Sequence, residues 1–301
     1  MKFITIKAFF LFLILSISGY TQNNEESLLY LDQKPPGLQP VVFAPSIISK
    51  PSESEFGSVF SKDGKEFFYG VVINGKSEIR YTRLVKDSWT TPETIISDSN
   101  FGFNDPFLSP DENRLYYISD RSIKGKGDKK DHDIWYSKKR PYGWSKPINA
   151  GANINSAGNE YYMSFTNNGT MYFSSNVLSE KNNDHDFDIY ASKQINGEFQ
   201  KPEKLSDAIN TKSYEADVFV APDESYVIFC AIRKEGLGRG DLYISFKNED
   251  DSWTTAKNMG ASINTKGHEL CPFVTKDGKY FFYTSNQDIY WVDAFIINQY
   301  R

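Results

Sequence analysis

A unit of roughly 55 residues recurs five times in this chain, and a hairpin turn marks each copy most clearly. The five turns read FSKDGKEFFY from Phe60, LSPDENRLYY from Leu108, FTNNGTMYF from Phe165, VAPDESYVIF from Val220 and VTKDGKYFFY from Val274. An aspartate or asparagine takes the same place in each turn, at positions 63, 111, 168, 223 and 277. Because one unit of such an array cannot bury its own faces, we expect the copies to pack against one another.

Three further marks keep the same register. An acidic residue followed by an aliphatic one stands at Glu78, Asp133, Asp188, Asp241 and Asp288. An aromatic residue follows at Trp89, Trp144, Phe199 and Trp253, at intervals of 55, 55 and 54 residues. A linker then leads to the next unit, as INSAGNE from Ile154, INTKSYE from Ile209 and INTKGHE from Ile263.

Each unit contains four short strand patterns separated by turn signals, and we expect the aromatic residue to open the fourth strand. The chain is 16% aromatic and shows no long apolar stripe at the helical period, which favours strands over helices. Four strands per unit at fixed spacing predict an all-β fold, a five-bladed β-propeller of four-stranded antiparallel blades. A stacked solenoid is the alternative.

The two ends of the repeat region favour a closed ring. The fifth unit stops at Arg301 before an aromatic-led fourth strand, whereas VVFAPSIIS from Val41 resembles SWTTPETIIS from Ser88. We therefore expect the N-terminal residues 41–49 to supply the missing strand of the last blade and to remove the exposed sheet edge. If Ile47 and Ile48 are both buried there, they contribute roughly 3–6 kcal/mol.

The first residues predict an export signal. Lys2 and Lys7 lie in a charged start, residues 8–17 are almost wholly apolar but too short to span a bilayer, and small residues follow. We expect residues 1–21 to be a signal peptide, 22–40 an extended segment and 41–301 the propeller, in a periplasmic or secreted product. Cleavage removes two lysines and no acid, so the formal charge changes from −5 to −7 (−5 − 2) and argues against a nucleic-acid partner.

The two cysteines, Cys230 and Cys271, lie far from the predicted cleavage site, so the sequence predicts no lipid anchor there. Both fall in predicted strands of neighbouring units. An oxidising compartment permits a bridge, but the sequence does not place their Cα atoms within bridging distance, and we expect two buried free thiols.

The turns SPDENRLYY and TKDGKYFFY, the linker INTKGHE and the segment DIWYSKKRPYGWSKPINAGANIN from Asp133 carry a family resemblance. They resemble the WD40-like Pro-Asp β-propeller repeats of TolB-type proteins and of peptidoglycan-associated outer-membrane propeller proteins of Bacteroidetes-like bacteria. The resemblance covers roughly residues 41–290. It implies a non-catalytic binding or scaffolding module of the cell envelope, with a peptide, glycan or protein as partner. Since neither the helical module of TolB nor a peptidoglycan-binding domain is recognisable, we expect a free-standing, monomeric propeller.

Four glutamates, Glu55, Glu160, Glu215 and Glu269, lie eight residues before the turn aspartate or asparagine. In the second unit Phe103 takes this place, and Asp105 lies two residues on, toward the same side. The first strand of each blade lines the central channel of a propeller, so these five acids are candidate ligand-binding residues. A residue repeated in every unit favours a structural role, and a site for a metal or cationic ligand on the axis is the alternative. We expect no cofactor beyond a possible structural cation.

Several other side chains are weaker candidates. His132, His185 and His268 lie beside acidic residues in loops of one predicted face, where histidines from three units could meet over the channel as ligand-binding residues. The run DHDFD at 184–188 alternates oxygen ligands as a calcium loop does, but it lacks the following glycine and the distant glutamate. We expect the acidic residues at 133, 188, 241 and 288 to accept backbone hydrogen bonds, and the repeated aromatic residues to pack between blades.

Long loops gather on this same face, at residues 118–132, 175–186 and 230–240. Function usually resides on such loops, and the basic stretch RSIKGKGDKKDH from Arg121 belongs to one of them. The sequence has no GxSxG nucleophile motif. The enzyme alternative is a glycoside hydrolase or lyase that uses Glu160, Glu215 and Glu269 at the channel mouth, although their equivalent places argue against separate acid and base roles.

Overall fold

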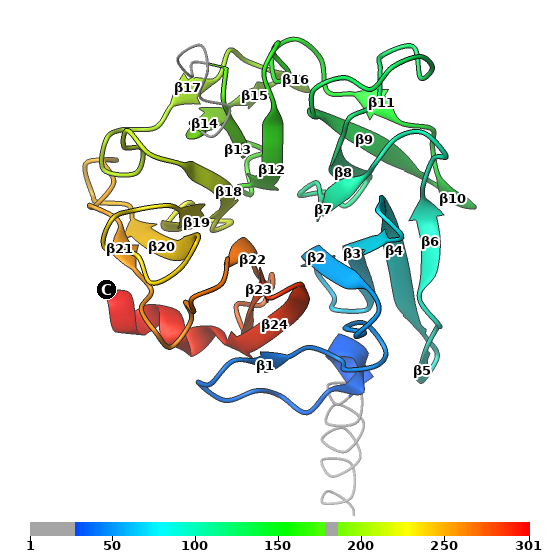
Figure 1. Ribbon diagram of the computed structural model, residues 1–301, viewed down its shortest axis with the longest axis horizontal. Coiled ribbons are helices and arrows are strands. Elements are labelled where there is room, and N and C mark those ends of the chain that lie inside the picture. The colour runs from blue at the N-terminus through cyan, green and yellow to red at the C-terminus, as the bar shows by residue number, and fades with distance from the viewer. Residues whose placement is uncertain (1–27, 178–185) are drawn as a thin grey trace, which may run out of the picture.

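The computed structural model describes residues 28–177 and 186–301 of the chain. Five antiparallel sheets of these residues stand as blades around one central axis, and a two-stranded sheet accompanies the third blade (Figure 1). The predicted five-bladed β-propeller is therefore confirmed, and the solenoid alternative is wrong. No helix in these two ranges is long and apolar enough to cross a membrane.

Each blade has three main strands that run in chain order from the axis outward. The innermost strands, which surround the axis in Figure 1, are β2 (Ser54–Phe60), β7 (Asn104–Leu108), β12 (Glu160–Phe165), β18 (Glu215–Val220) and β22 (Leu270–Val274). The second strands are β3 (Glu66–Ile73), β8 (Arg114–Ser119), β13 (Met171–Ser175), β19 (Tyr226–Ala231) and β23 (Tyr280–Ser285). The third strands are β4 (Lys76–Val85), β9 (Asp133–Arg140), β14 (Asp188–Ser192), β20 (Asp241–Phe246) and β24 (Asp288–Asp293), and the 3-10 helix η1 (Ala294–Tyr300) follows β24.

The predicted hairpin turn joins the first and second strands of each blade, and its acidic residue holds the turn. Asp63 accepts hydrogen bonds from the Ser61 hydroxyl at 2.6 Å and from the Lys65 backbone N–H at 3.1 Å. Asp111 and Asp277 repeat this pattern with the same two distances. A short carboxylate that closes its own turn explains why the position recurs in the sequence.

In the first four blades the aromatic residue and the outermost strand are separate, which differs from the expectation that the aromatic residue opens that strand. In three blades the aromatic residue sits in a two-residue strand of its own, namely β5 (Ser88–Trp89), β10 (Gly143–Trp144) and β16 (Glu198–Phe199), the last paired with β15 (Gln194–Ile195). The outermost strand proper is β6 (Glu93–Ile96), β11 (Ile148–Asn149), β17 (Glu203–Lys204) and β21 (Lys257–Asn258). Pro92, Pro147 and Pro202 separate the two pieces because proline has no backbone N–H for the ladder.

Residues near the amino end complete the fifth blade. The strand β1 (Val41–Val42) pairs antiparallel with β24, and the Phe43 N–H donates to the Ile289 carbonyl at 2.8 Å, so the ring closes as predicted (Figure 1). Phe43 and Ile48 are fully buried, but Ile47 is 44% exposed. The expectation that both isoleucines are buried is therefore wrong for Ile47, since the tight turn around it directs this side chain outward. The buried side chain of Phe43, and not that of Ile47, contributes apolar surface to the closure together with Ile48.

The segment before β1 adds a second set of contacts. Residues 28–32 form a short helical turn, and the Leu28 carbonyl accepts a hydrogen bond from the Trp89 indole at 2.7 Å. Tyr30 packs edge-on against Phe60 and donates its hydroxyl to Asp277 at 2.8 Å. The segment thus touches the first and fifth blades, on both sides of the closure.

The repeated linker clasps consecutive blades together. Asn264 accepts the Leu242 N–H at 2.8 Å and donates to the Leu242 carbonyl at 3.0 Å, on the third strand of the blade behind it. Thr265 donates its hydroxyl at 2.7 Å and its N–H at 3.0 Å to Glu269, at the start of the blade ahead. The triads Asn155, Ser156, Glu160 and Asn210, Thr211, Glu215 repeat these contacts at the two preceding junctions. The motif recurs because the asparagine bonds the preceding blade and the serine or threonine bonds the glutamate of the following blade.

The junctions on either side of the first blade lack this clasp. Phe103 takes the place of the glutamate in the second blade, so that junction has no carboxylate to hold. Glu55, in the first blade, accepts the Lys50 N–H at 3.3 Å, and its Oε2 has no hydrogen-bond partner among the described residues.

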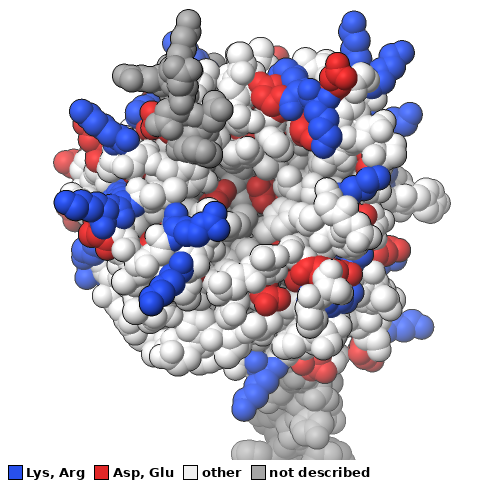
Figure 2. Space-filling model, viewed as in Figure 1, with Lys and Arg blue, Asp and Glu red and all other residues white. Residues whose placement is uncertain are grey.

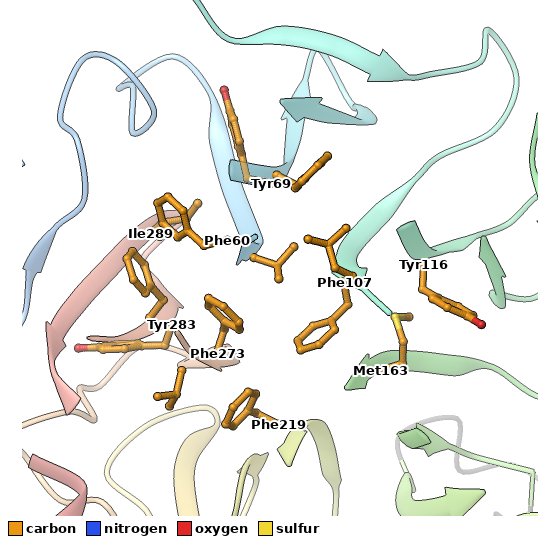
Figure 3. Packing of buried hydrophobic residues seen from close by; sticks show 14 of the residues in the cluster. Phe60, Tyr69, Phe107, Tyr116, Met163, Phe219, Phe273, Tyr283 and Ile289 are labelled. Carbon is orange, nitrogen blue, oxygen red and sulfur yellow. The ribbon is translucent and has the colours of Figure 1, made fainter. Parts of the chain in front are cut away.

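Aromatic rings fill the lower part of the axis. Figure 3 shows Phe107, Phe219 and Phe273 pointing toward one another from three different innermost strands. The Phe273 ring centroid lies 5.9 Å from that of Phe107 and 6.0 Å from that of Phe219. Farther out, Trp144 packs on Phe68 of the preceding blade at 5.8 Å between centroids, as expected for the repeated aromatic residues.

Candidate functional site

Every innermost strand contains a β-bulge at the equivalent position. The register between the innermost and second strands shifts once in each blade. At each shift one residue adopts a positive φ, and these residues are Gly57 (52°), Asp105 (53°), Tyr162 (35°), Asp217 (52°) and Cys271 (52°). A bulge re-aims its side chain. The five blades thus present one bulge residue each at the axis.

The backbone of these bulges repeats, but the residue types do not. A left-handed conformation costs an ordinary residue about 1–2 kcal/mol, yet four of the five positions are not glycine. Where glycine does occur, a neighbour demands it, because a Cβ on Gly57 would lie 2.8 Å from Oδ1 of Asp105. Such retained strain is typical of functional positions.

Three of the bulge residues, Asp105, Asp217 and Cys271, line a central pocket of about 630 Å³. Its wall consists of the beginnings of innermost strands and of turns between second and third strands, and Arg239 of the 230–240 loop lies at its edge. The pocket therefore opens on the face that bears the long loops. Figure 2 shows this hollow at the centre of the face, with acidic atoms inside it.

The two aspartates and the thiol form a compact cluster. One oxygen of each carboxylate and the Cys271 Sγ all lie within 4.8 Å of one another. Asp105 is 7% exposed and Asp217 is 8% exposed. Burial raises the pKa of both carboxyl groups, and the charge of Asp105 raises that of Asp217 further. Such a pair holds a proton, or needs a cation, at neutral pH.

Tyr162, the bulge residue of the third blade, spans the axis near this cluster. It is fully buried, and its hydroxyl donates to the Pro272 carbonyl in the fifth blade at 2.8 Å. The phenylalanine layer of Figure 3 lies on the same axis. Neither Tyr162 nor these phenylalanines line the pocket.

The structure places the predicted acids in two different settings. Glu160, Glu215 and Glu269 are fully buried and accept the hydrogen bonds of the linkers, and they are not among the residues that line the pocket. Burial raises the pKa of Glu160 to about 7. Asp105 and Glu55 do line the pocket, and burial likewise raises the pKa of Glu55 to about 7.

The structure does not bring the histidines together in the pocket. His268 lines the pocket, and its Nε2 lies 3.4 Å from the Cys230 Sγ. His132 packs at a tilt against Tyr161, with 5.3 Å between ring centroids, and is not a lining residue. His185 lies outside the described residues.

The remaining candidates have local partners. Asp241 accepts the N–H groups of Leu237 and Gly238, as expected, whereas Asp188 instead pairs with Lys204 at 2.6 Å. Of the DHDFD run, Asp184 lies outside the described residues. Within residues 28–177 and 186–301, the one group of three side chains suited to a metal is Asp105, Asp217 and Cys271.

Both cysteines are buried free thiols. Asp105 is a candidate from the sequence pattern, whereas Asp217 and Cys271 are site residues that the pattern did not indicate. Aligning the five units on their glutamates would have placed both at the phase of Gly57, two residues on. At this position of the repeat one unit has a glycine, and two others have the polar residues Asp217 and Cys271.

Comparisons with known proteins identify the fold. Neither the protein-family models nor the curated protein sequences contain a match to this chain. Among solved structures, TolB from Acinetobacter baumannii matches with a TM-score of 0.50 and 14% identity, over 79% of this chain and 54% of TolB. This chain therefore spans about half the length of TolB.

Two further solved structures match at a similar level. A protein of unknown function from Dyadobacter fermentans DSM 18053 has a TM-score of 0.51 and 15% identity, over 82% of this chain and 78% of its own. A thermostable family-43 glycoside hydrolase has a TM-score of 0.51 and 14% identity, over 81% and 91%. At such identities the likeness shows the propeller fold alone, which hosts binding proteins and enzymes alike.

Proposed function

We propose that the protein is an exported propeller of the cell envelope that binds part of a peptide, glycan or protein partner in its central pocket, without catalysis. The observation that carries this is the broken symmetry of the bulges. Residues that only hold the blades together tend to be repeated, as the linker glutamates Glu160, Glu215 and Glu269 are. Recognition of an asymmetric ligand instead requires different side chains at equivalent places, and the pocket supplies them.

The setting of the pocket also supports binding. It has the size and the mixed lining of a ligand site, with a few convergent polar groups among apolar walls. Export rests on the signal peptide predicted at residues 1–21, and the envelope location on the resemblance to TolB-type repeats. The match to TolB supports this at the level of the fold.

A glycoside hydrolase or lyase is the second candidate, and one observation favours it. Asp105 and Asp217 lie close together in a pocket with raised pKa values, as acid and base groups of glycosidases do. The carboxylates first considered for this role, Glu160, Glu215 and Glu269, are committed to the linkers.

Binding to a defined panel of synthetic peptides, neutral oligosaccharides and peptidoglycan fragments tests the proposal. We expect at least one class to bind without being changed, and Ser54→Trp, at the pocket wall, to abolish that binding. The exposed substitution Tyr142→Trp, on a hairpin away from the pocket, is the matched control. If the protein hydrolyses a chromogenic glycoside and Asp217→Asn abolishes this hydrolysis, the function is that of an enzyme and the non-catalytic binding function is wrong.

A further inference from the structure

We propose that the central pocket receives a primary ammonium group on an apolar stem, such as a lysine side chain of its partner, between Asp105 and Asp217. This inference rests on the proposed binding function and names the chemistry of the ligand. It depends on the cluster, on what surrounds it and on the apolar lining residues.

The first observation is that the cluster has no cation of its own. Within residues 28–177 and 186–301, no lysine or arginine forms an ion pair with either carboxylate. Asp105 is contacted by the Cys271 thiol at 3.5 Å, and Asp217 by the Cys271 backbone N–H. The hydroxyls of Tyr161, Tyr162 and Tyr214 lie near the pair: burial raises the pKa of each most, and the charge of Asp217 adds to each rise.

Two further oxygens of lining residues are unpaired. Oε2 of Glu55, a fully buried side chain, and Oδ1 of Asn104 have no hydrogen-bond partner among the described residues. Carboxylate and amide oxygens are acceptors, so this side of the pocket is short of donors. Buried acceptors of this kind are normally satisfied, and a ligand with several N–H groups is suited to do so.

The spacing within the cluster fits an ammonium group. A tetrahedral nitrogen that donates at about 2.9 Å holds its acceptors about 4.7 Å apart. One oxygen of Asp105 and one of Asp217 lie within 4.8 Å of each other, so a nitrogen between them can donate to both. A guanidinium is less suited, because its planar fork prefers both oxygens of one carboxylate. A neutral sugar hydroxyl brings no charge to balance the pair.

The apolar lining residues match an alkyl stem. Phe56, Val72, Ile118 and Leu270 line the same pocket as the two aspartates. Methylene groups pack against such side chains while the charged end of the ligand reaches the polar groups.

Two capped amino acids test the inference on the unmodified protein. We expect N-acetyl-lysine-N-methylamide to bind at least tenfold more tightly than the norleucine analogue, which has the same stem without the nitrogen. We expect Asp217→Asn and Asp105→Asn each to weaken lysine binding tenfold or more. Asp128→Asn, which removes a charge from the exposed 118–132 loop, should leave it unchanged. Equal binding of lysine and norleucine, or no effect of either pocket variant, overturns the inference.

Metal ions form a second arm of the experiment. Zn²⁺ or Ca²⁺ that binds one to one, blocks the lysine probe and is lost with Cys271→Ser would identify a metal site and overturn the ammonium assignment. If a neutral ligand binds and Ser54→Trp abolishes it while lysine does not bind, the inference fails and the binding function stands. If Ser54→Trp changes the binding of no ligand, both fail.

Discussion

Tyr162 of the third blade reaches across the axis and donates its hydroxyl to the carbonyl of Pro272 in the fifth blade, at 2.8 Å. This one bond links two blades that are not neighbours in the ring. Tyr162 also lies near Asp105 and Asp217, whose charges add to the effect of burial in raising the pKa of its hydroxyl.

Replacing Tyr162 by phenylalanine should lower the free energy of unfolding by about 1–3 kcal/mol, since a buried carbonyl then loses its partner. Urea denaturation measures the change. Tyr142→Phe is the control, because this tyrosine is fully exposed, and it should have no effect. An unchanged midpoint for Tyr162→Phe would show that the bond across the axis contributes nothing to stability.

The contacts of the linker predict a loss of stability at a single asparagine. Asn264→Ala removes both hydrogen bonds to Leu242 and leaves the buried Leu242 N–H unpaired, whereas the Leu242 carbonyl keeps the Met259 N–H at 2.9 Å. We therefore expect a loss of about 1–3 kcal/mol. Lys266→Ala, two residues along the same linker and exposed, should change stability by less than about 0.5 kcal/mol. Thermal denaturation of both variants measures the difference. Equal melting temperatures would show that the linker contacts do not stabilise the fold.

The closure of the ring predicts opposite outcomes for neighbouring residues. Phe43→Ala should destabilise the protein by about 3–5 kcal/mol and Ile48→Ala by about 2–5 kcal/mol, since both side chains are fully buried. Ile47→Ala should be nearly neutral because that side chain is 44% exposed. Deletion of residues up to Ser49 should give an unfolded or aggregating protein, and a truncated form with an unchanged melting temperature would rule out this closure.

Stability should fall as the pH rises through the neutral range. The pKa values of Asp105 and Asp217 are raised in the folded state, and that of Glu160 is raised to about 7. Because these carboxyl groups hold their protons more tightly in the folded state, their contribution is present below about pH 4 and is lost as the pH rises toward 7. The loss is on the order of a few kcal/mol in total.

The double variant Asp105→Asn and Asp217→Asn measures how much of this pH dependence of stability comes from the two pocket carboxyl groups. Asparagine does not titrate, so we expect the melting temperature of the double variant to fall less between pH 5 and pH 8 than that of the unmodified protein. Parallel curves for the two proteins would show that the pocket carboxylates are not perturbed.

The repeat made most of the fold predictable. The turn aspartates, the linkers and the incomplete fifth unit identified five blades and their closure by residues 41–49, because each of these features acts within one unit or between neighbours. The split outer strand was missed, although Pro92, Pro147 and Pro202 were visible. A proline in a strand pattern deserved more weight than the aromatic residue beside it.

The site was less predictable, for a physical reason. Whether a residue adopts a left-handed bulge depends on the pairing of two strands and on the neighbouring blade, not on its own type. Asp217 and Cys271 therefore gave no local signal, and only Gly57 has the residue type that the bulge favours. The glutamates gave a strong signal because they are structural, and a structural solution is repeated.

The first blade is joined to both of its neighbours without the asparagine and glutamate contacts found at the other junctions. Thermal unfolding of the ring should therefore begin at these two junctions. The pocket draws most of its lining from the first, second and fifth blades, and Tyr161, Asp217 and Arg239 add the third and fourth. A ligand in the pocket would contact blades on both sides of these junctions. Its binding would therefore raise the free energy of unfolding of the ring.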